Sequence, residues 1–249
     1  MLKRKKEKFN LRKQKGWLAG SSATQTICVS FLLVIAAGTL LLSLPIASKQ
    51  GRLGLVDALF TATSATCVTG LVVRDTWTQF TFFGQAVLLL LIQVGGLGLV
   101  TLTSFFALAA RRRMGFRDLR LLGESVSAEG LSKATEVLKI VIRLAATFEA
   151  MGAVLLMFAL VPQFGPEGIW VSIFTAISAF CNAGFDLMGP VSGSFASLEC
   201  FVGDPLINLT VMTLILVAGL GFPVWQDLAQ NRLCWKKLRL HTRAVLALT

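Results

Sequence analysis

The hydrophobic positions of the chain fall into long apolar stretches that polar, mostly basic segments separate. Four stretches are long enough for a helix that crosses a bilayer, which needs about 20 apolar residues. They cover residues 24–47, 80–110, 135–161 and 205–226. Two apolar segments, at residues 51–66 and 168–179, are too short to cross. The pattern predicts an all-α polytopic membrane protein with two units of span, short helix, loop and span.

The two units are related by an internal sequence repeat. Residues 60–70 read FTATSATCVTG and residues 174–184 read FTAISAFCNAG, which are identical at seven of eleven positions. The second spans repeat as well, because VGGLG at residues 94–98 corresponds to VAGLG at residues 217–221. Repetition at corresponding places predicts two copies of one structural unit.

Basic residues are concentrated in three clusters. Of the 24 Lys and Arg, 21 lie at residues 3–15, 111–143 and 232–243. The positive-inside rule places these clusters and the N-terminus in the cytoplasm, so the short helices must enter from outside and return. A cleaved signal peptide is the alternative for the basic N-terminus, but its long apolar core and the spans that follow favour an anchor.

Composition agrees with a membrane protein and argues against several functional classes. Hydrophobic residues make up 55% of the chain, charged residues 15%, and mean hydropathy is +0.72. The net charge of +11 does not indicate nucleic-acid binding, because the basic residues flank apolar spans. The five cysteines form no CxxC or Cys/His pattern and His241 is the only histidine, so we expect no metal cluster, no disulfide framework and no enzyme.

The loops after the short helices carry the candidate chemistry. Backbone carbonyls inside a bilayer need surrounding protein or water, and a ring of them can replace the hydration shell of a cation. Gly70 and Gly184 can adopt the positive φ that directs successive carbonyls inward. The short helices are expected to end at about Thr66 and Ala179, with the negative ends of their dipoles at the loops. The predicted ion-binding residues are Thr66, Cys67, Val68, Thr69, Gly70, Phe180, Cys181, Asn182, Ala183 and Gly184.

Other residues near the loops have two interpretations each. Glu149 is the only acidic residue well inside a span, so it is a functional candidate, or it hydrogen-bonds a neighbouring helix. Asp57 in the first short helix either holds the loop or draws cations to its mouth. Gly95, Gly96 and Gly98 are expected to allow close helix packing and not to contact ions.

Several segments resemble the Trk/Ktr/HKT family of potassium transporters. They are SATCVTGL and SAFCNAGF in the loops, and QVGGLGLVT and GLGFPVW after them, so the resemblance covers nearly the whole chain. Within this family the chain resembles KtrB-like membrane subunits, because no extra spans precede its first repeat. The family implies a pore of four repeats, a homodimer of pores in the cell membrane, and a cytosolic nucleotide-binding regulatory ring.

The resemblance also implies the transported ion. Potassium is expected because plant relatives that transport sodium carry serine at the position of Gly70. Sodium is expected only as a co-ion or activator, and no covalently bound cofactor is implied.

The repeat divides the chain into five parts. They are a basic cytoplasmic arm (1–23), a first repeat (24–110), a cytoplasmic loop (111–134), a second repeat (135–229), and a cytoplasmic loop with the start of a third repeat (230–249). Because the family carries four repeats, the chain is expected to be a fragment, a truncated reading frame, or one of two chains that together complete the pore. A non-conducting half-transporter that acts as a membrane assembly partner is the alternative function.

Overall fold

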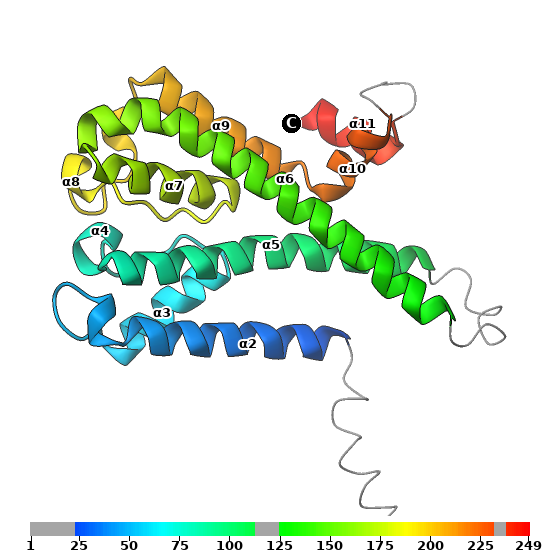
Figure 1. Ribbon diagram of the computed structural model, residues 1–249, viewed down its shortest axis with the longest axis horizontal. Coiled ribbons are helices and arrows are strands. Elements are labelled where there is room, and N and C mark those ends of the chain that lie inside the picture. Colours follow the sequence, from blue (N-terminus) through cyan, green and yellow to red (C-terminus); the bar gives the residue numbers. More distant parts are fainter. Residues whose placement is uncertain (1–22, 113–124, 232–237) are drawn as a thin grey trace, which may run out of the picture.

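The computed structural model describes residues 23–112, 125–231 and 238–249, and every regular element within them is helical. This confirms the predicted all-α class. Nearly all of the expected basic arm and half of the expected loop at 111–134 lie outside the described residues. The helices form two groups that lie side by side (Figure 1).

In the first group a short helix lies between two long ones. Its elements are α2 (Ala23–Leu42), η1 (Pro45–Ala47), α3 (Leu55–Thr66), α4 (Thr76–Gln79) and α5 (Phe82–Arg112). The short α3 contacts both α2 and α5. Asp75 caps the single turn of α4, because its carboxylate accepts a hydrogen bond from the N–H of Thr78.

The second group has the same order of long and short helices. Its elements are α6 (Ser125–Phe164), α7 (Glu167–Phe180), α8 (Gly189–Ser192), η4 (Glu199–Phe201) and α9 (Pro205–Gly219). The short α7 contacts α6 and α9, and it also contacts α5 of the first group. Asp204 caps α9 by accepting hydrogen bonds from the N–H groups of Leu206 and Ile207.

Corresponding glycines make corresponding contacts in the two groups. A methyl group added at Gly38 of α2 would lie 2.7 Å from the side chain of Leu91 in α5. One added at Gly152 of α6 would lie 2.6 Å from the side chain of Leu214 in α9. The first and last helices of each group therefore approach closely at matching positions, as small residues allow in membrane proteins.

The fourth apolar stretch, expected to be one helix over 205–226, is interrupted. α9 ends at Gly219, Gly221 has a φ of +79°, and a second helix, α10 (Phe222–Asn231), follows. Pro223 supplies the physical reason, because it has no N–H to donate to the carbonyl four residues earlier. The last helix, α11 (Leu240–Leu248), contacts α10.

Helix lengths separate the long elements from the short ones. Among the described residues, Lys139–Phe164 of α6 is the one segment that meets both the length and the apolarity of a membrane span. As whole helices, α2 has 20 residues and α5 has 31, which correspond to about 30 Å and about 46 Å. A hydrocarbon core is about 30 Å thick, so α3 with 12 residues and α7 with 14 are too short to cross it.

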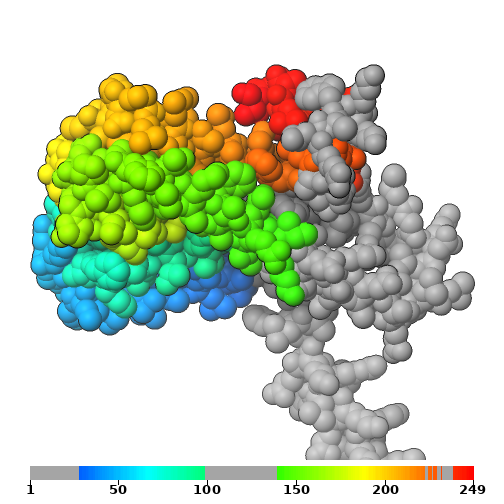
Figure 2. All heavy atoms as spheres, turned by 45° about the horizontal axis from the view of Figure 1, so that its top comes forward, coloured from blue at the N-terminus to red at the C-terminus, as the bar shows by residue number. Residues whose placement is uncertain are grey.

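Large apolar side chains cover the outside of the long helices. Leu40 of α2, Phe158 of α6 and Leu209 of α9 are 67%, 70% and 63% exposed. A soluble monomer rarely leaves such a continuous apolar surface uncovered, whereas a lipid environment favours it. The described side chains of both helix groups pack into one body (Figure 2).

Candidate functional site

The loops that follow α3 and α7 begin with the same backbone hydrogen bonds. The N–H of Cys67 donates to the carbonyl of Thr63 at 2.8 Å, and the N–H of Thr69 donates to the carbonyl of Ser64 at 3.0 Å. In the second loop, the N–H of Cys181 donates to the carbonyl of Ile177 at 2.9 Å, and the N–H of Ala183 donates to the carbonyl of Ser178 at 2.8 Å. Each short helix therefore ends in one fixed turn, with its C-terminal carbonyls and dipole at the loop.

The backbone angles of the two loops also match. Val68 has a φ of 57° and its counterpart Asn182 has a φ of 56°. Gly70 and Gly184 have φ values of 72° and 73°. Two alternate positions of each loop thus have a left-handed backbone. L-residues adopt this conformation at a cost in free energy, whereas glycine, which has no Cβ, adopts it readily.

The two loops meet at their glycines. A methyl group added at Gly70 would lie 2.8 Å from the carbonyl oxygen of Ala183 and 3.3 Å from the Cα of Gly184. One added at Gly184 would lie 3.2 Å from the Cα of Gly70. The structure therefore brings the two predicted glycines together, and a side chain at either position would separate the loops.

Serines of the short helices hold the loops from behind. The hydroxyls of Ser64 and Thr69 lie 2.9 Å apart in a hydrogen bond. In the second loop, Ser178 donates to the carbonyl of Phe185 at 2.5 Å and accepts from its N–H at 3.1 Å. Both serines are buried, and they occupy one of the identical positions of the repeat. The repeat therefore indicated them, but the search for ion ligands did not include them.

Two glycines of α5 let that helix lie directly against both loops. A methyl group at Gly95 would overlap the carbonyl oxygen of Thr66 and lie 2.8 Å from its carbonyl carbon. One at Gly96 would lie 2.7 Å from the Cβ and the Sγ of Cys181. These glycines contact the loop backbone and side chains, as the packing interpretation expects. Among the described residues, a methyl group added at Gly98 would meet one atom outside its own helix within 4 Å, a ring carbon of Phe31 at 3.9 Å.

The ten predicted ion-binding residues differ in exposure. Cys67, Thr69, Asn182 and Gly184 are exposed, and Val68, Gly70 and Phe180 are half-buried. Thr66, Cys181 and Ala183 are buried. The carbonyl of Thr66 faces α5, so it differs in environment from the exposed segment after it.

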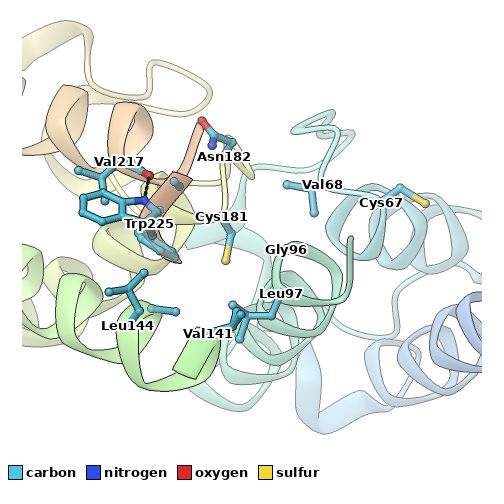
Figure 3. A pocket seen from close by; sticks show the side chains of 13 residues that line it. Cys67, Val68, Gly96, Leu97, Val141, Leu144, Cys181, Asn182, Val217 and Trp225 are labelled. Carbon is cyan, nitrogen blue, oxygen red and sulfur yellow. Dashed lines mark hydrogen bonds between the residues drawn. The ribbon is translucent and has the colours of Figure 1, made fainter. Parts of the chain in front are cut away.

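A cavity of about 290 Å³ lies beside both loops. Its lining includes Val68 and Asn182 from the loops, Leu144 of α6 and Trp225 of α10 (Figure 3). The Trp225 indole is held in place because its N–H donates to the carbonyl of Val217 at 2.9 Å. The interruption between α9 and α10 thus brings an aromatic side chain to the loops, which the sequence did not predict.

Glu149 is buried and takes part in a polar contact between α5 and α6. The amide nitrogen of Gln93 donates to both carboxylate oxygens of Glu149, at 2.9 and 3.1 Å. The thiol of Cys181 donates to the amide oxygen of Gln93 at 3.7 Å. Of the two interpretations of Glu149, the structure shows the hydrogen bond to a neighbouring helix. Sequence reasoning missed Gln93, a polar residue inside an apolar span.

Acidic residues lie in the segments before and after the loops. Asp57 of α3 forms an ion pair with Arg74 at 3.1 Å, which agrees with a role in holding the first loop segment. Burial raises the pKa of the Asp186 carboxyl, in the segment after the second loop, above its ordinary value. The nearby Asp75 carboxylate raises this pKa further, whereas hydrogen bonds from Met188 and Ser197 lower it.

The segment after the second loop reaches back to the first group. The N–H of Phe195 donates to Asp75 at 3.2 Å, and a methyl group at Gly189 would lie 3.0 Å from the Cβ of Trp77. The two groups are therefore joined at this end as well as through the loops and α5.

Comparison with known proteins adds a family to this geometry. The profile of the TrkH family, described as a cation transport protein, matches residues 2–244. The chain is 40% identical over 223 residues to Ktr system potassium uptake protein B of Bacillus subtilis, covering 89% of this chain and 48% of the relative. It is 38% identical over 231 residues to potassium/sodium uptake protein NtpJ of Enterococcus hirae, covering 92% and 49%.

A third relative, Ktr system potassium uptake protein B of Vibrio alginolyticus, is 38% identical over 228 residues, with coverage of 90% and 48%. The chain spans about half the length of these curated relatives. The match extends over both repeats and confirms the resemblance drawn from the loop motifs. The chain belongs to the TrkH family of cation transport proteins, and within the Trk/Ktr superfamily it is KtrB-like.

Proposed function

We propose that this chain forms part of a potassium-uptake pore in the cell membrane, and that its two loops supply backbone carbonyls to the selectivity filter. The relatives support the ion, because their names describe the uptake of potassium, or of potassium and sodium. In this proposal each repeat consists of a span, a re-entrant pore helix with its loop, and a second span.

The observation that carries the proposal is the matched geometry of the loops. Both contain left-handed residues at the same two positions, both make the same backbone hydrogen bonds, and they meet at Gly70 and Gly184. Alternating left-handed residues can direct successive carbonyls to one side. Such carbonyls can replace the water that a potassium ion sheds, and the helix C-termini of α3 and α7 favour a positive charge there.

Thr66 has a different role from the other predicted ligands in this proposal. Its carbonyl faces Gly95 and its buried hydroxyl has no hydrogen-bond partner among the described residues. We assign the ion contacts to the carbonyls at 67–70 and 180–184, and assign Thr66 to the packing of the loop against α5.

The proposal includes the surroundings that the family implies. The three basic clusters place the N-terminus in the cytoplasm. A Ktr-type cytosolic subunit controls the pore, the complete transporter is a homodimer, and sodium stimulates the uptake of potassium. The relatives named as Ktr system proteins support a partner subunit.

The decisive experiment measures potassium uptake with sodium competition in cells that lack their own potassium transporters. The wild-type protein is compared with the Gly70→Ser variant, and both are expressed from the natural coding sequence. Serine at a φ of 72° costs about 1–2 kcal/mol and collides with the carbonyl of Ala183. We expect the preference for potassium over sodium to fall by about tenfold or more.

Gly98→Ser is the matched control, because a Cβ at Gly98 would meet no described atom outside its own helix closer than 3.9 Å and the φ of Gly98 is not in the left-handed region. It should retain the wild-type preference. If Gly70→Ser reaches the membrane in normal amounts and keeps the potassium preference, the filter assignment is wrong. If wild-type protein reconstituted in liposomes with its partner subunit carries no potassium, the non-conducting assembly role replaces transport.

A further inference from the structure

A polar chain of three side chains connects the second loop to two long helices. Glu149 on α6 accepts two hydrogen bonds from the Gln93 amide on α5, and Gln93 in turn accepts one from the Cys181 thiol of the loop. Gly96, one turn after Gln93 on α5, brings the helix against the same cysteine. The position of Cys181 is thus determined by contact and by hydrogen bonding together.

Chemistry fixes the direction of this chain. A carboxylate can only accept, so the Gln93 amide must turn its NH₂ group to Glu149. Its oxygen then faces Cys181, and the thiol is the group that can donate to it. If Glu149 were absent, the amide could rotate and the thiol would lose a defined acceptor.

The energetics argue against an incidental contact. Glu149 is 8% exposed within an apolar helix, and Gln93 is the side chain that hydrogen-bonds it among the described residues. A buried carboxylate in a membrane helix is costly and is retained where it serves a function. Glu149 is connected to Cys181 of the second loop through the Gln93 amide, which indicates a function in positioning that loop.

The polar chain joins α5 of the first repeat to α6 and the loop of the second repeat. Matching glycine contacts relate position 149 to Ile35 on α2, and position 93 to Leu216 on α9. Both counterparts are apolar, and Cys67, the counterpart of Cys181, is exposed. The first repeat therefore has no carboxylate at the position that matches Glu149.

We propose that Gln93 and Glu149 are positioning residues that form a polar bracket behind Cys181 and thereby set the direction of the carbonyls at 181–184. This inference rests on the proposed function, since it assigns a role in selectivity to residues that do not touch the ion. Cys181 connects the polar bracket to the backbone, and its thiol acts as a hydrogen-bond donor.

The experiment measures the potassium-to-sodium preference, together with KM and Vmax for potassium, in the uptake assay described above. Gln93→Leu, Glu149→Leu and Cys181→Ala each remove one link, and each should lower the preference by about fivefold. Glu149→Gln still presents an acceptor to Gln93, and Cys181→Ser still presents a donor. These two conservative variants should stay within about twofold of wild type.

Gln163→Leu is the matched control for the loss of a glutamine amide, because Gln163 is exposed near the end of α6 and, among the described residues, its amide hydrogen-bonds the Ala159 carbonyl of its own helix. It should leave the preference unchanged. If Gln93→Leu does not reach the membrane, the comparison of Cys181→Ala with Cys181→Ser decides, since these variants differ by one hydroxyl group.

Two results would overturn the inference. If the variants that break the chain lower only Vmax and leave the ion preference intact, Gln93 and Glu149 serve stability alone. If Cys181→Ser loses the preference as fully as Cys181→Ala, the donor role is wrong. Gly70→Ser in the same assay separates the two proposals. If Gly70→Ser lowers the potassium-to-sodium preference and Gln93→Leu does not, the polar-bracket proposal is wrong and the filter proposal stands.

Discussion

Gly95 and Gly96 allow α5 to contact both loops. Both lie in a helix, where glycine is unfavourable by about 1 kcal/mol relative to alanine. That cost is offset by contact, because the absence of a Cβ lets α5 touch the Thr66 carbonyl and Cys181. The same pair of glycines thus serves both loops at once, one glycine for each loop.

Alanine at position 95 should be destabilising although it is the better helix former. Its methyl group meets a backbone carbonyl that cannot move without moving the first loop, and overpacking of this kind costs about 1–3 kcal/mol. We expect Gly95→Ala to lower the thermal midpoint of the detergent-solubilised protein and to reduce potassium uptake.

Gly98→Ala provides the comparison on the same helix. Among the described residues outside its own helix, the added methyl meets no atom closer than 3.9 Å, so the gain in helix propensity should raise the midpoint slightly and leave uptake unchanged. Equal midpoints for the two variants would contradict the proposed close contact at Thr66.

At the scale of the elements, the sequence predicted the short helices better than the last span. The expected ends at Thr66 and Ala179 compare with Thr66 and Phe180 in the structure, because the motif carries the turn that follows each helix. The expected helix over 205–226 is divided, although VAGLG there and VGGLG in α5 are nearly the same. The difference lies two residues further on, where Pro223 replaces the valine of the first repeat at position 100.

The site could be predicted only in part for a related reason. The loop residues follow from a local repeat, so both glycines and both cysteines were found in the sequence. The contact of Gln93 with Glu149 joins residues 56 positions apart, and no periodicity relates them. Trp225 reaches the cavity only because α9 stops early, which again depends on one proline.

The division of α9 and α10 leads to a prediction about Gly221. Its φ of +79° should make Gly221→Ala destabilising by about 1–2 kcal/mol. Gly219→Ala adds a methyl group that meets no described atom outside its own helix within 4 Å, and the φ of Gly219 is not left-handed, so the thermal midpoint of this variant should match or exceed that of wild type. A midpoint for Gly221→Ala at or above that of Gly219→Ala would mean that the left-handed turn is not required.

At the scale of the whole molecule, charge and helix length together predict a topology. With 21 of 24 basic residues in three clusters, the positive-inside rule predicts that both pairs of spans begin and end in the cytoplasm. We expect a membrane-impermeant thiol reagent to label a single cysteine at Ser192 in intact cells. A single cysteine at Arg112 should react only after the membrane is opened.

The five natural cysteines must first be replaced by serine or alanine, so that each probe is the only thiol. The parent without cysteines then serves as the blank. Labelling of position 112 from outside, with protection of position 192, would reverse the orientation and with it the direction of entry of both short helices.

The bond between Asp75 and Phe195 has a consequence for biosynthesis. The two residues are 120 positions apart, and a ribosome adds about 5–20 residues per second, so the partner of Asp75 is made roughly 6–24 s after it. During that interval the first helix group can insert, but its segment around Asp75 lacks this contact with the second group. This connection between the groups can therefore form only after the segment that follows the second loop has been made.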